Sequence, residues 1–496
     1  MIDQGGHATR AIVYDSKGHC VCHAEVGINT ITRNVLEVEH DPVELINSVN
    51  SVIDEVHKQL GDNYSKIQVA GLATQRSSIV CWDNDTGKAL SPIISWQDRR
   101  TSNNISQFED SSQIIHELTG LYLNPHYGAS KIHWCLNHLS DVKKALSNGT
   151  LYVGPLASYI MFHMLDKQPF IIDPANGSRT LMMDVKTADW APELLTLFSI
   201  PANILPEIVN TKSFFGNIVR HSNSSLCDDS HQIPLLLCTG DQSAAIFSEG
   251  ELAVDEVFVN AGTGAFILKT SKDMPDLQSE KLLASVVYAD KKIIKYVIEG
   301  TVNGAGRALQ WFAEQSNIFD YESMLDKWSE EYHTPPIFIN AISGVGSPYW
   351  VADHESYFVM EKKELTAAGI KVSHEEDNSC LNNEERFVAV LESIVFLIAE
   401  NIKCIQRVSE RVNQIRLAGG ITASHCFCQK LANLLKCNVV LAQEKEATAK
   451  GVFFLLSGKK PNEDKVHSAM FHPNNDPMLI DRNTLWADLM KKAFSN

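Results

Sequence analysis

Two glycine-rich turns, about half a chain apart, precede or separate apolar segments that resemble strands. Gly5-Gly6 comes shortly before Arg10 to Tyr14, and Gly262-Thr263-Gly264 lies between Val257 to Asn260 and Ala265 to Lys269. A chain whose second half opens as its first half does can fold into two related domains. Two unrelated hairpin turns would give the same local pattern, so the elements around the turns have to be considered.

The elements after the first turn predict an α/β domain. Residues 10–14 and 20–26 are typical of a β-hairpin around a Lys-Gly turn. Residues 41–60 carry apolar side chains at helical spacing behind an Asp-Pro start, which predicts a helix, and residues 67–73 resemble a buried strand. The order strand, strand, helix, strand is typical of an α/β domain.

Later segments add a second hairpin, an insert and a long helix. Residues 79–82 and 89–96 flank an Asn-Asp-Thr-Gly turn, which predicts the hairpin. Residues 361–386 are charged and mostly acidic, which predicts an exposed insert. Residues 385–411 show one apolar face at helical spacing and are expected to form a long helix.

Length and charge limit the class of protein. A chain of 496 residues is expected to form two to four domains, and two large ones are the first expectation. Hydrophobic residues at 44% and charged residues at 21% are typical of a globular protein. The formal charge of -17 disfavours nucleic acid and anionic membranes as partners, although it allows a local cationic pocket for phosphate.

The cysteines and the chain start bear on the compartment. Eleven cysteines at irregular spacing predict reduced thiols in the cytoplasm. The run from His19 to His23 could bind a metal, but it alternates like a strand and lacks a second ligand pair, so a strand is favoured. Without a long apolar run or a leader pattern, secretion and membrane insertion are disfavoured. Because the first strand begins almost at Met1, we expect the native start to lie upstream.

Glycine turns and two aspartates suggest phosphate chemistry. Successive backbone N–H groups in such turns can bind phosphate oxygens, and Gly419-Gly420 is a third candidate, although each alone is more often a simple turn. Asp3 ends a strand before the first turn and could hold Mg²⁺ through water, or only cap the turn. Asp241 lies between an apolar strand and a helix start, where it could act in chemistry or only as an N-cap.

Motifs in a fixed order resemble one family along nearly the whole chain. They are Asp3-Gln4-Gly5, Gln75-Arg76, Trp96 to Thr101, Asp173 with Asn176 to Thr180, Gly240-Asp241-Gln242, Gly262-Thr263-Gly264, Glu299-Gly300, Gly306 with Gln310-Trp311, Gly344 with Gly346 to Trp350, and Gly419-Gly420. This set resembles the FGGY carbohydrate kinases, and most closely their glycerol kinase branch. The resemblance implies two ribonuclease H-like domains of the actin and hexokinase type, with ATP between them.

The resemblance also implies the reaction and its residues. The protein would transfer the γ-phosphoryl group of ATP to a hydroxyl of a small polyol or sugar, with Asp241 as general base and Asp3 beside Mg²⁺. The implied nucleotide-binding residues are Gly5, Gly6, Arg10, Gly262, Thr263, Gly264, Gly306, Gln310, Gly419 and Gly420. The implied acceptor-binding residues are Arg76, Ser77, Trp96, His126, Asp241, Gln242 and Phe266.

Several positions depart from the glycerol kinase pattern. Gly6 and His7 replace two threonines, which removes two hydroxyl donors to phosphate. Ser77 replaces a glutamate and His126 a tyrosine, so groups that would bind glycerol are changed and a larger or differently substituted acceptor is also a candidate. The loop that binds a fructose bisphosphate inhibitor in some relatives is missing between Arg220 and Pro234, so no such regulation is expected.

The expected organisation is an N-terminal domain over 1–248 with the acceptor site, a nucleotide-binding domain over 254–458, and a C-terminal tail over 459–496 that packs on the domain. The family also makes a homodimer a reasonable expectation. Two other readings stay open. One is a kinase-like ligand-binding or regulatory protein that transfers phosphate poorly, and the other is a chaperone- or actin-like ATPase that shares only the fold.

Overall fold

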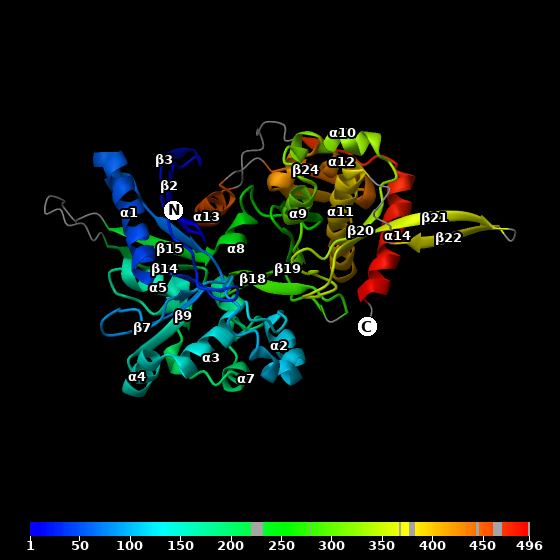
Figure 1. Ribbon diagram of the computed structural model, residues 1–496. Helices are drawn as coiled ribbons and strands as arrows, with labels where there is room; N and C mark the ends of the chain where they lie inside the picture. The colour runs from blue at the N-terminus through cyan, green and yellow to red at the C-terminus, as the bar shows by residue number, and fades with distance from the viewer. Residues whose placement is uncertain are drawn as a thin grey trace.

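The computed structural model describes residues 1–219, 232–277, 279–366, 369–375, 382–442, 446–459 and 469–494. Two α/β domains lie side by side, with the N-terminal half of the chain on the left of Figure 1 and most of the C-terminal half on the right. Each domain has its own mixed sheet and its own apolar core.

The N-terminal domain is built on a six-stranded sheet. Its strands are β1 (Ile2–Gln4), β2 (Ala8–Tyr14), β3 (Cys20–Gly27), β6 (Ala70–Thr74), β14 (Lys212–Ile218) and β15 (Ile233–Gly240). The order across the sheet is β14-β15-β6-β1-β2-β3. β1 is antiparallel to β2 and parallel to β6, and β6 is parallel to β15. The first predicted hairpin and the following strand are therefore confirmed.

A second sheet and several helices complete this domain. The sheet has β4 (Ile31–Thr32), β5 (Val38–His40), β7 (Ile79–Asp83), β8 (Ile93–Ile94) and β9 (Leu151–Pro155), and β7 pairs with β8 as the second predicted hairpin requires. The helices are α1 (Pro42–Leu60), α2 (Ser112–Thr119), α3 (Gly128–His138), α4 (Ser140–Asn148), α5 (Leu156–Met164), α6 (Pro174–Gly177), α7 (Pro192–Leu197) and α8 (Asp241–Ala245). Two small strand pairs are β10 (Ile171–Ile172) with β13 (Glu207–Ile208) and β11 (Met183–Asp184) with β12 (Asp189–Trp190).

The C-terminal domain is built on a seven-stranded sheet in the order β18-β19-β17-β16-β23-β24-β25. These strands are β16 (Glu256–Ala261), β17 (Ala265–Ser271), β18 (Leu283–Ala289), β19 (Ile294–Val302), β23 (Gln414–Ala418), β24 (Asn438–Leu441) and β25 (Met470–Phe471). The helices are α9 (Gly306–Ser316), α10 (Leu325–Glu331), α11 (Asn383–Val408), α12 (His425–Leu435), α13 (Ala447–Ser457) and α14 (Pro477–Phe494).

The two main sheets share one topology. In each, three adjacent antiparallel strands are followed by a long helix and then by strands that run parallel to the first of the three. The C-terminal sheet adds β18 at its edge, between the second and third of these strands in sequence. The N-terminal set is β1-β2-β3, α1, β6 and β15, and the C-terminal set is β16-β17-β19, α11, β23 and β24. In each domain a glycine turn joins the first two strands. The predicted class, two related ribonuclease H-like α/β domains, is confirmed.

The two long helices form where the sequence pattern predicts them. Asp41 caps α1 by accepting hydrogen bonds from the N–H groups of Val43 and Glu44, and Pro42 follows at the first helical position. The predicted helix at 385–411 is α11, whose Asn382 side chain accepts from the Glu385 N–H at the helix start. α11 is buried along most of its length because it crosses the core of the C-terminal domain.

Helix α13 lies against the N-terminal sheet although it follows the C-terminal sheet in sequence. It packs on α8, β6 and β15, and it lies next to α8 in Figure 1. Gly451 of α13 meets the backbone of Ala244 in α8 so closely that a Cβ atom would overlap the Ala244 carbonyl oxygen. Val452 joins a small apolar cluster with Ala73, Leu237 and Ala244.

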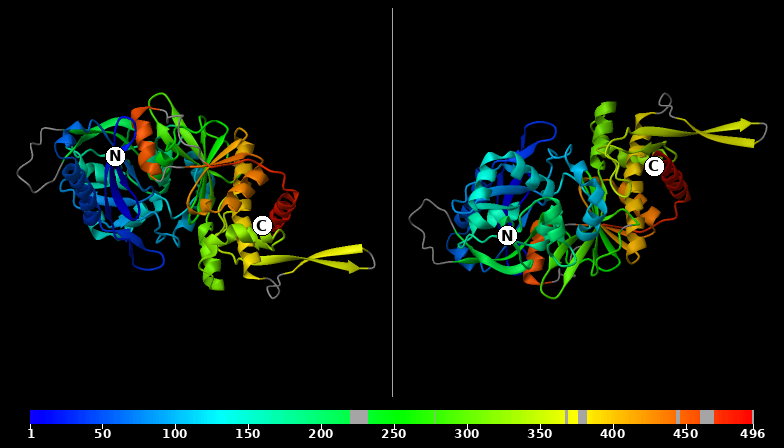
Figure 2. Two further views of the ribbon diagram at one scale, coloured as in Figure 1. Left: turned by 90° about the horizontal axis from the view of Figure 1, so that it is seen from above. Right: turned by 90° about the horizontal axis from the view of Figure 1, so that it is seen from below.

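The charged segment predicted as an insert contains a hairpin. β20 (Ile337–Ile339) pairs with β21 (Tyr357–Thr366), and β21 pairs with β22 (Gly369–Glu375). The β21–β22 hairpin projects away from the C-terminal domain in both views of Figure 2. Beside it, α14 packs on the core of the C-terminal domain through Trp486 and Met490, which are both fully buried.

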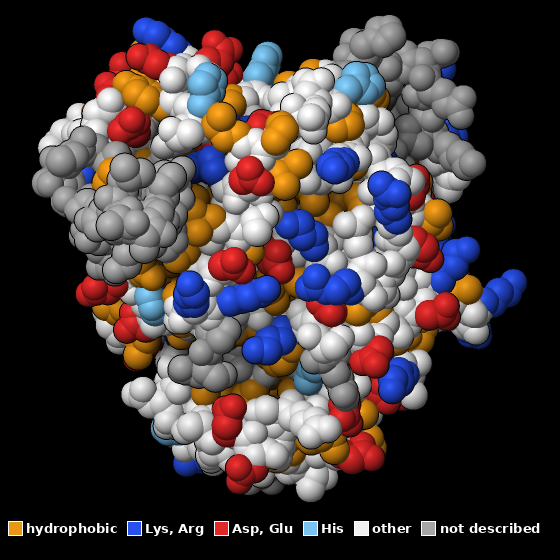
Figure 3. All heavy atoms as spheres, turned by 90° about the vertical axis from the view of Figure 1, so that its right-hand side faces the viewer, with side chains coloured by type: hydrophobic (Ala, Val, Ile, Leu, Met, Phe, Trp, Pro, Cys, Tyr) orange, Lys and Arg blue, Asp and Glu red, His pale blue; other side chains and the backbone are white. Residues whose placement is uncertain are grey.

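The cysteines within the described residues are free thiols. Acidic and basic side chains are interspersed over the face shown in Figure 3. Within the described part of the chain, no helix combines the length and the apolar character needed to cross a membrane.

Candidate active site

Asp241 lies where strand β15 ends and helix α8 begins. Arg76 follows the neighbouring parallel strand β6, and its Nε atom lies 3.9 Å from Oδ1 of Asp241. The Arg76 side chain packs directly against Gly240, where a Cβ atom would overlap Cδ of Arg76. Glycine at position 240 therefore allows the guanidinium to reach the aspartate.

Asp241 is the first residue of α8 and not its N-cap, which is Gly240. Its Oδ1 accepts a hydrogen bond of 2.6 Å from the N–H of Gln242. Burial raises the pKa of Asp241, although Arg76 and the Gln242 amide oppose this shift. A carboxylate with a raised pKa binds a proton more readily, which suits a general base.

Asp3, in the middle of the three-residue strand β1, interacts electrostatically with Asp241. Burial and the negative charge of Asp241 raise the pKa of Asp3 to about 7, while Arg10 opposes the shift. A divalent cation near Asp3 would offset this repulsion. The Asp3 carboxylate suits Mg²⁺, which binds proteins through few carboxylates and keeps several waters. Arg10 also donates a 2.6 Å hydrogen bond to Glu25.

Trp96 and His126 lie together beside the first glycine turn. Their ring centroids are 5.7 Å apart in an edge-to-face arrangement, and Trp96 Nε1 is the nearest atom to the position that a Cβ on Gly6 would take, at 3.7 Å. Trp96 is 37% exposed, so its indole can still contact a ligand. Burial and nearby cations, led by Lys131, hold the pKa of His126 well below its usual range, which favours the neutral imidazole.

Ser77 adds an unusual hydroxyl next to Arg76. Its φ is 62°, in the left-handed region, and its buried Oγ has no hydrogen-bond partner among the described residues. A buried hydroxyl without a partner costs free energy that a bound hydroxyl could recover.

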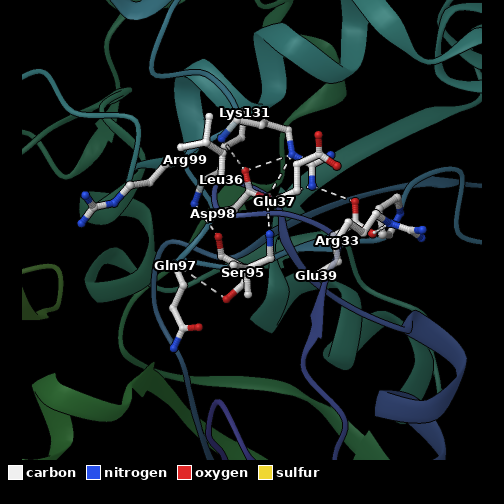
Figure 4. Close-up of polar contacts among 12 residues, drawn as sticks. Arg33, Leu36, Glu37, Glu39, Ser95, Gln97, Asp98, Arg99 and Lys131 are labelled. Carbon is white, nitrogen blue, oxygen red and sulfur yellow. Dashed lines mark hydrogen bonds and ion pairs between the residues drawn. The ribbon is translucent and has the colours of Figure 1, made fainter. Parts of the chain in front are cut away.

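A buried ionic cluster fixes the segment that carries Trp96. Asp98 accepts hydrogen bonds from Arg100 and from the backbone N–H of Val38, and Arg100 also pairs with Glu39 at 2.7 Å (Figure 4). Arg99 points away from this cluster in the same view. The Trp-Gln-Asp-Arg-Arg motif thus uses Asp98 and Arg100 to anchor the segment.

The second and third glycine turns meet in the C-terminal domain. The Gly262 carbonyl accepts from the N–H of Gly306, at the start of α9, and the Thr263 carbonyl accepts from the N–H of Arg307. Gly419, with φ of 103°, lies against the Ala261 backbone so closely that a Cβ would overlap its carbonyl oxygen. By contrast, a Cβ on Gly420 would meet no atom within 4 Å. The backbone is thus tightly packed at Gly419 and open to one side at Gly420. A glycine turn of this kind fits phosphate or nucleotide groups.

Some amides of the turns are already used. The N–H of Gly5 donates to the Ala8 carbonyl, and the N–H of Gly262 donates to the Gly264 carbonyl. These two donors close the turns themselves. Donors to phosphate must therefore come from other amides of each turn.

An ion network that the sequence analysis did not predict joins the domains. Arg179 of the N-terminal domain pairs at 2.9 Å with Glu299 of β19, and Arg76 Nη1 lies 3.9 Å from the same carboxylate. Ser285 hydrogen-bonds both Arg179 and Glu299. The motif set above includes Arg179 and Glu299, but a buried pairing between them could not be read from sequence.

The remaining predicted residues lie on the expected elements without a shown role. Phe266 is 37% exposed on β17, and Gln310 and Thr263 are exposed on and near α9. Gln242 lies beside Asp241. The segment 220–231, to which the inhibitor-loop prediction applies, lies outside the described residues. Across the described ranges, no group of three His, Cys, Asp or Glu side chains could hold a metal, and His19 to His23 lie on and beside β3.

Two ribonuclease H-like domains with paired glycine turns define a protein of the actin and hexokinase fold type. Residues 1–248 match the N-terminal domain of the FGGY family of carbohydrate kinases, and residues 257–457 match its C-terminal domain. The chain belongs to this family of carbohydrate kinases.

Named relatives and solved structures agree with this assignment. Glycerol kinase of Borreliella burgdorferi (strain ZS7) is 29% identical over 92% of this chain and 87% of its own length, and that of Borreliella afzelii is 30% identical over the same shares. The crystal structure of Plasmodium falciparum glycerol kinase with ADP superposes with a TM-score of 0.85 at 25% identity, covering 100% of this chain and 97% of the other. A xylulose kinase from Lactobacillus acidophilus shares the fold, with a TM-score of 0.80 at 19% identity over 100% and 98%.

Proposed function

We propose that this kinase transfers a phosphoryl group from ATP to a hydroxyl of glycerol or a related polyol or ketose, with Asp241 as general base. The observation that carries the proposal is the placement of Asp241 beside Arg76, at the carboxyl ends of two adjacent parallel strands. Ligands of open α/β sheets bind at this edge. The pKa of Asp241 is raised in the same place.

The residues have distinct tasks in this proposal. Asp241 accepts the proton of the attacking hydroxyl, while Arg76 and the Trp96 indole orient the acceptor. The turns at Gly5-Gly6 and Gly262 to Gly264, with Gly306, Gly419 and Gly420, hold the nucleotide. ATP supplies the phosphoryl group, and Mg²⁺ beside Asp3 would neutralise charge on its phosphates.

The acceptor is left open among small polyols and sugars. The named relatives are glycerol kinases, which favours glycerol. Ser77 and His126, where that branch has glutamate and tyrosine, favour a different pattern of hydroxyl groups. A screen over glycerol, erythritol, pentitols and ketopentoses therefore separates these candidates.

The test is a coupled ADP-release assay of that screen, run with wild type and Asp241→Asn. We expect one acceptor to stimulate turnover and Asp241→Asn to lower kcat by about 10²- to 10⁴-fold while ATP binding persists. Asp41→Asn is the control, because Asn replaces Asp well as a helix cap. A stimulated rate that survives Asp241→Asn excludes the base assignment. Nucleotide binding without turnover on any acceptor favours the regulatory reading.

Oligomeric state and compartment are separate proposals. A homodimer is testable by light scattering on the purified full chain. A cytoplasmic location is testable by fractionation of cells that express it.

A further inference from the structure

Lys131 is a fully buried lysine on α3, outside the set of residues predicted for the site. Its ammonium group donates hydrogen bonds to three backbone carbonyls, those of Ser77 at 3.2 Å, Ser95 at 2.8 Å and His126 at 2.7 Å. An ammonium has three N–H donors, so these three carbonyls match its full capacity.

The three carbonyls come from three separate segments of the chain. Ser77 follows β6, Ser95 follows β8 and precedes Trp96, and His126 lies just before α3. These segments present Arg76 and Ser77, the Trp96 indole and the His126 imidazole. The Lys131 ammonium is therefore bonded to the backbone of all three segments, which carry Arg76 and Ser77, Trp96, and His126.

The three bonds of Lys131 join segments that carry predicted acceptor-site residues, in addition to any contribution they make to stability. Burying an ammonium is unfavourable unless hydrogen bonds compensate for lost water. Here burial lowers the pKa of Lys131 to about 7, and the nearby Asp98 opposes the shift. The Asp98–Arg100 cluster holds the Trp96 segment from another side, and Lys131 is drawn next to it in Figure 4.

We propose that Lys131 is a positioning residue that sets the geometry of the acceptor site by fixing Ser77, Trp96 and His126 relative to one another. The inference rests on the proposed function, because that proposal assigns Ser77, Trp96 and His126 to the acceptor site. Lys131 touches their backbones and not the acceptor. Its loss should therefore change acceptor binding more than nucleotide binding, which uses the glycine turns.

Lys269 offers a matched control. It is also a fully buried lysine, and its ammonium contacts the backbone carbonyl of Val254 in the C-terminal domain. Lys269→Met and Lys131→Met both remove a buried amino group and leave backbone carbonyl oxygens without their donor. Only Lys131→Met releases the acceptor segments.

The experiment measures KM for the best acceptor, KM for ATP and the melting temperature of wild type and both variants. We expect both variants to melt at lower temperature, and Lys131→Met alone to raise the acceptor KM by about tenfold or more while its ATP KM stays within about threefold of wild type. An unchanged acceptor KM in folded Lys131→Met overturns the inference.

Lys131→Gln covers the case in which Lys131→Met does not fold. Its amide keeps two N–H donors and carries no charge, so it is the milder change. The inference predicts a smaller rise in acceptor KM for it, again without a change for ATP. A Lys131→Gln enzyme with equal shifts for both substrates also overturns the inference. If wild type itself shows no acceptor-stimulated turnover, it is the proposed function that fails.

Discussion

Arg179 donates a 2.9 Å hydrogen bond to the carboxylate of Glu299, and this pair joins the two domains at a buried position. Arg76 lies near the same carboxylate, so one negative charge faces two guanidinium groups. We expect Glu299→Gln to lower the free energy of unfolding by about 3 kcal/mol, because it leaves buried positive charge uncompensated.

Urea unfolding would measure this loss. Glu314→Gln is the control, because Glu314 pairs with Arg307 at a similar 2.9 Å on the exposed surface of α9. Its loss should be about 1 kcal/mol or less. Equal losses of unfolding free energy for the two variants would show that the buried interdomain pair stabilises the protein no more than an exposed ion pair does.

Asp3 makes the stability depend on pH. Its pKa is raised from 3.8 to about 7 in the folded protein. The folded state therefore holds a proton on Asp3 that the unfolded state releases near pH 4, and the stabilisation from this proton is lost as pH rises from about 4 to about 7. Above pH 7 the cost is at most about 4 kcal/mol.

Asp3→Asn removes this cost. Without Mg²⁺ we expect the variant to be more stable than wild type at about pH 8 and similar to it below about pH 4, and Mg²⁺ with nucleotide to stabilise wild type more than the variant. Unfolding midpoints at both pH values test this, with the exposed Asp62→Asn as the reference. A variant that is less stable than wild type at the higher pH contradicts the argument.

Gly419 and Gly420 are adjacent but should respond differently to alanine. Gly419→Ala should lower the free energy of unfolding by at least about 1 kcal/mol, because its φ of 103° and its contact with Ala261 exclude a Cβ. Gly420→Ala should stay within about 0.5 kcal/mol of wild type. If the turn holds the nucleotide, Gly420→Ala should still raise the ATP KM about tenfold, a loss of about 1.4 kcal/mol. Nucleotide titrations of both variants would show whether this separation exists.

We expect the Ser77 hydroxyl to gain a hydrogen-bond partner only when the acceptor binds. Ser77→Ala should leave the stability of the free protein unchanged or improve it, because a buried hydroxyl without a partner is removed. The same change should raise the acceptor KM about tenfold, corresponding to one lost hydrogen bond. Ser248→Ala removes another such hydroxyl, which is not among the predicted site residues, and should leave the acceptor KM unchanged. If both variants behave alike in the kinetic assay, Ser77 does not bind the acceptor.

Sequence patterns predicted the local elements well because their causes are local. The Asp41 cap and the spacing of apolar residues mark α1, and the apolar face of α11 marks a core helix. Glycines between apolar segments likewise marked the turns of both domains. Motif resemblance then supplied the family.

The tertiary parts of the site could not be read from the chain. Arg76 meets Asp241 because β6 lies parallel to β15, and no local signal fixes such a distant pairing. Lys131 did leave a trace, since it stands among Ala129, Ile132 and Cys135 on the buried face of α3. A lysine on an apolar helical face can be noticed, but its three carbonyl partners depend on the folded loops.

Helix α13 is made late in synthesis but packs on the N-terminal domain, so the order of synthesis affects folding. The hydroxyl of Thr448 donates to the carbonyl of Asp241 at 3.4 Å, across 207 residues of chain. The ribosome therefore completes the strand that carries the aspartate long before it makes the helix that packs beneath it. Until then Ala73, Leu237 and Ala244 lack Val452, their partner in the small apolar cluster. A nascent N-terminal half should thus expose an apolar patch beside the Asp241 carboxylate until α13 has been made.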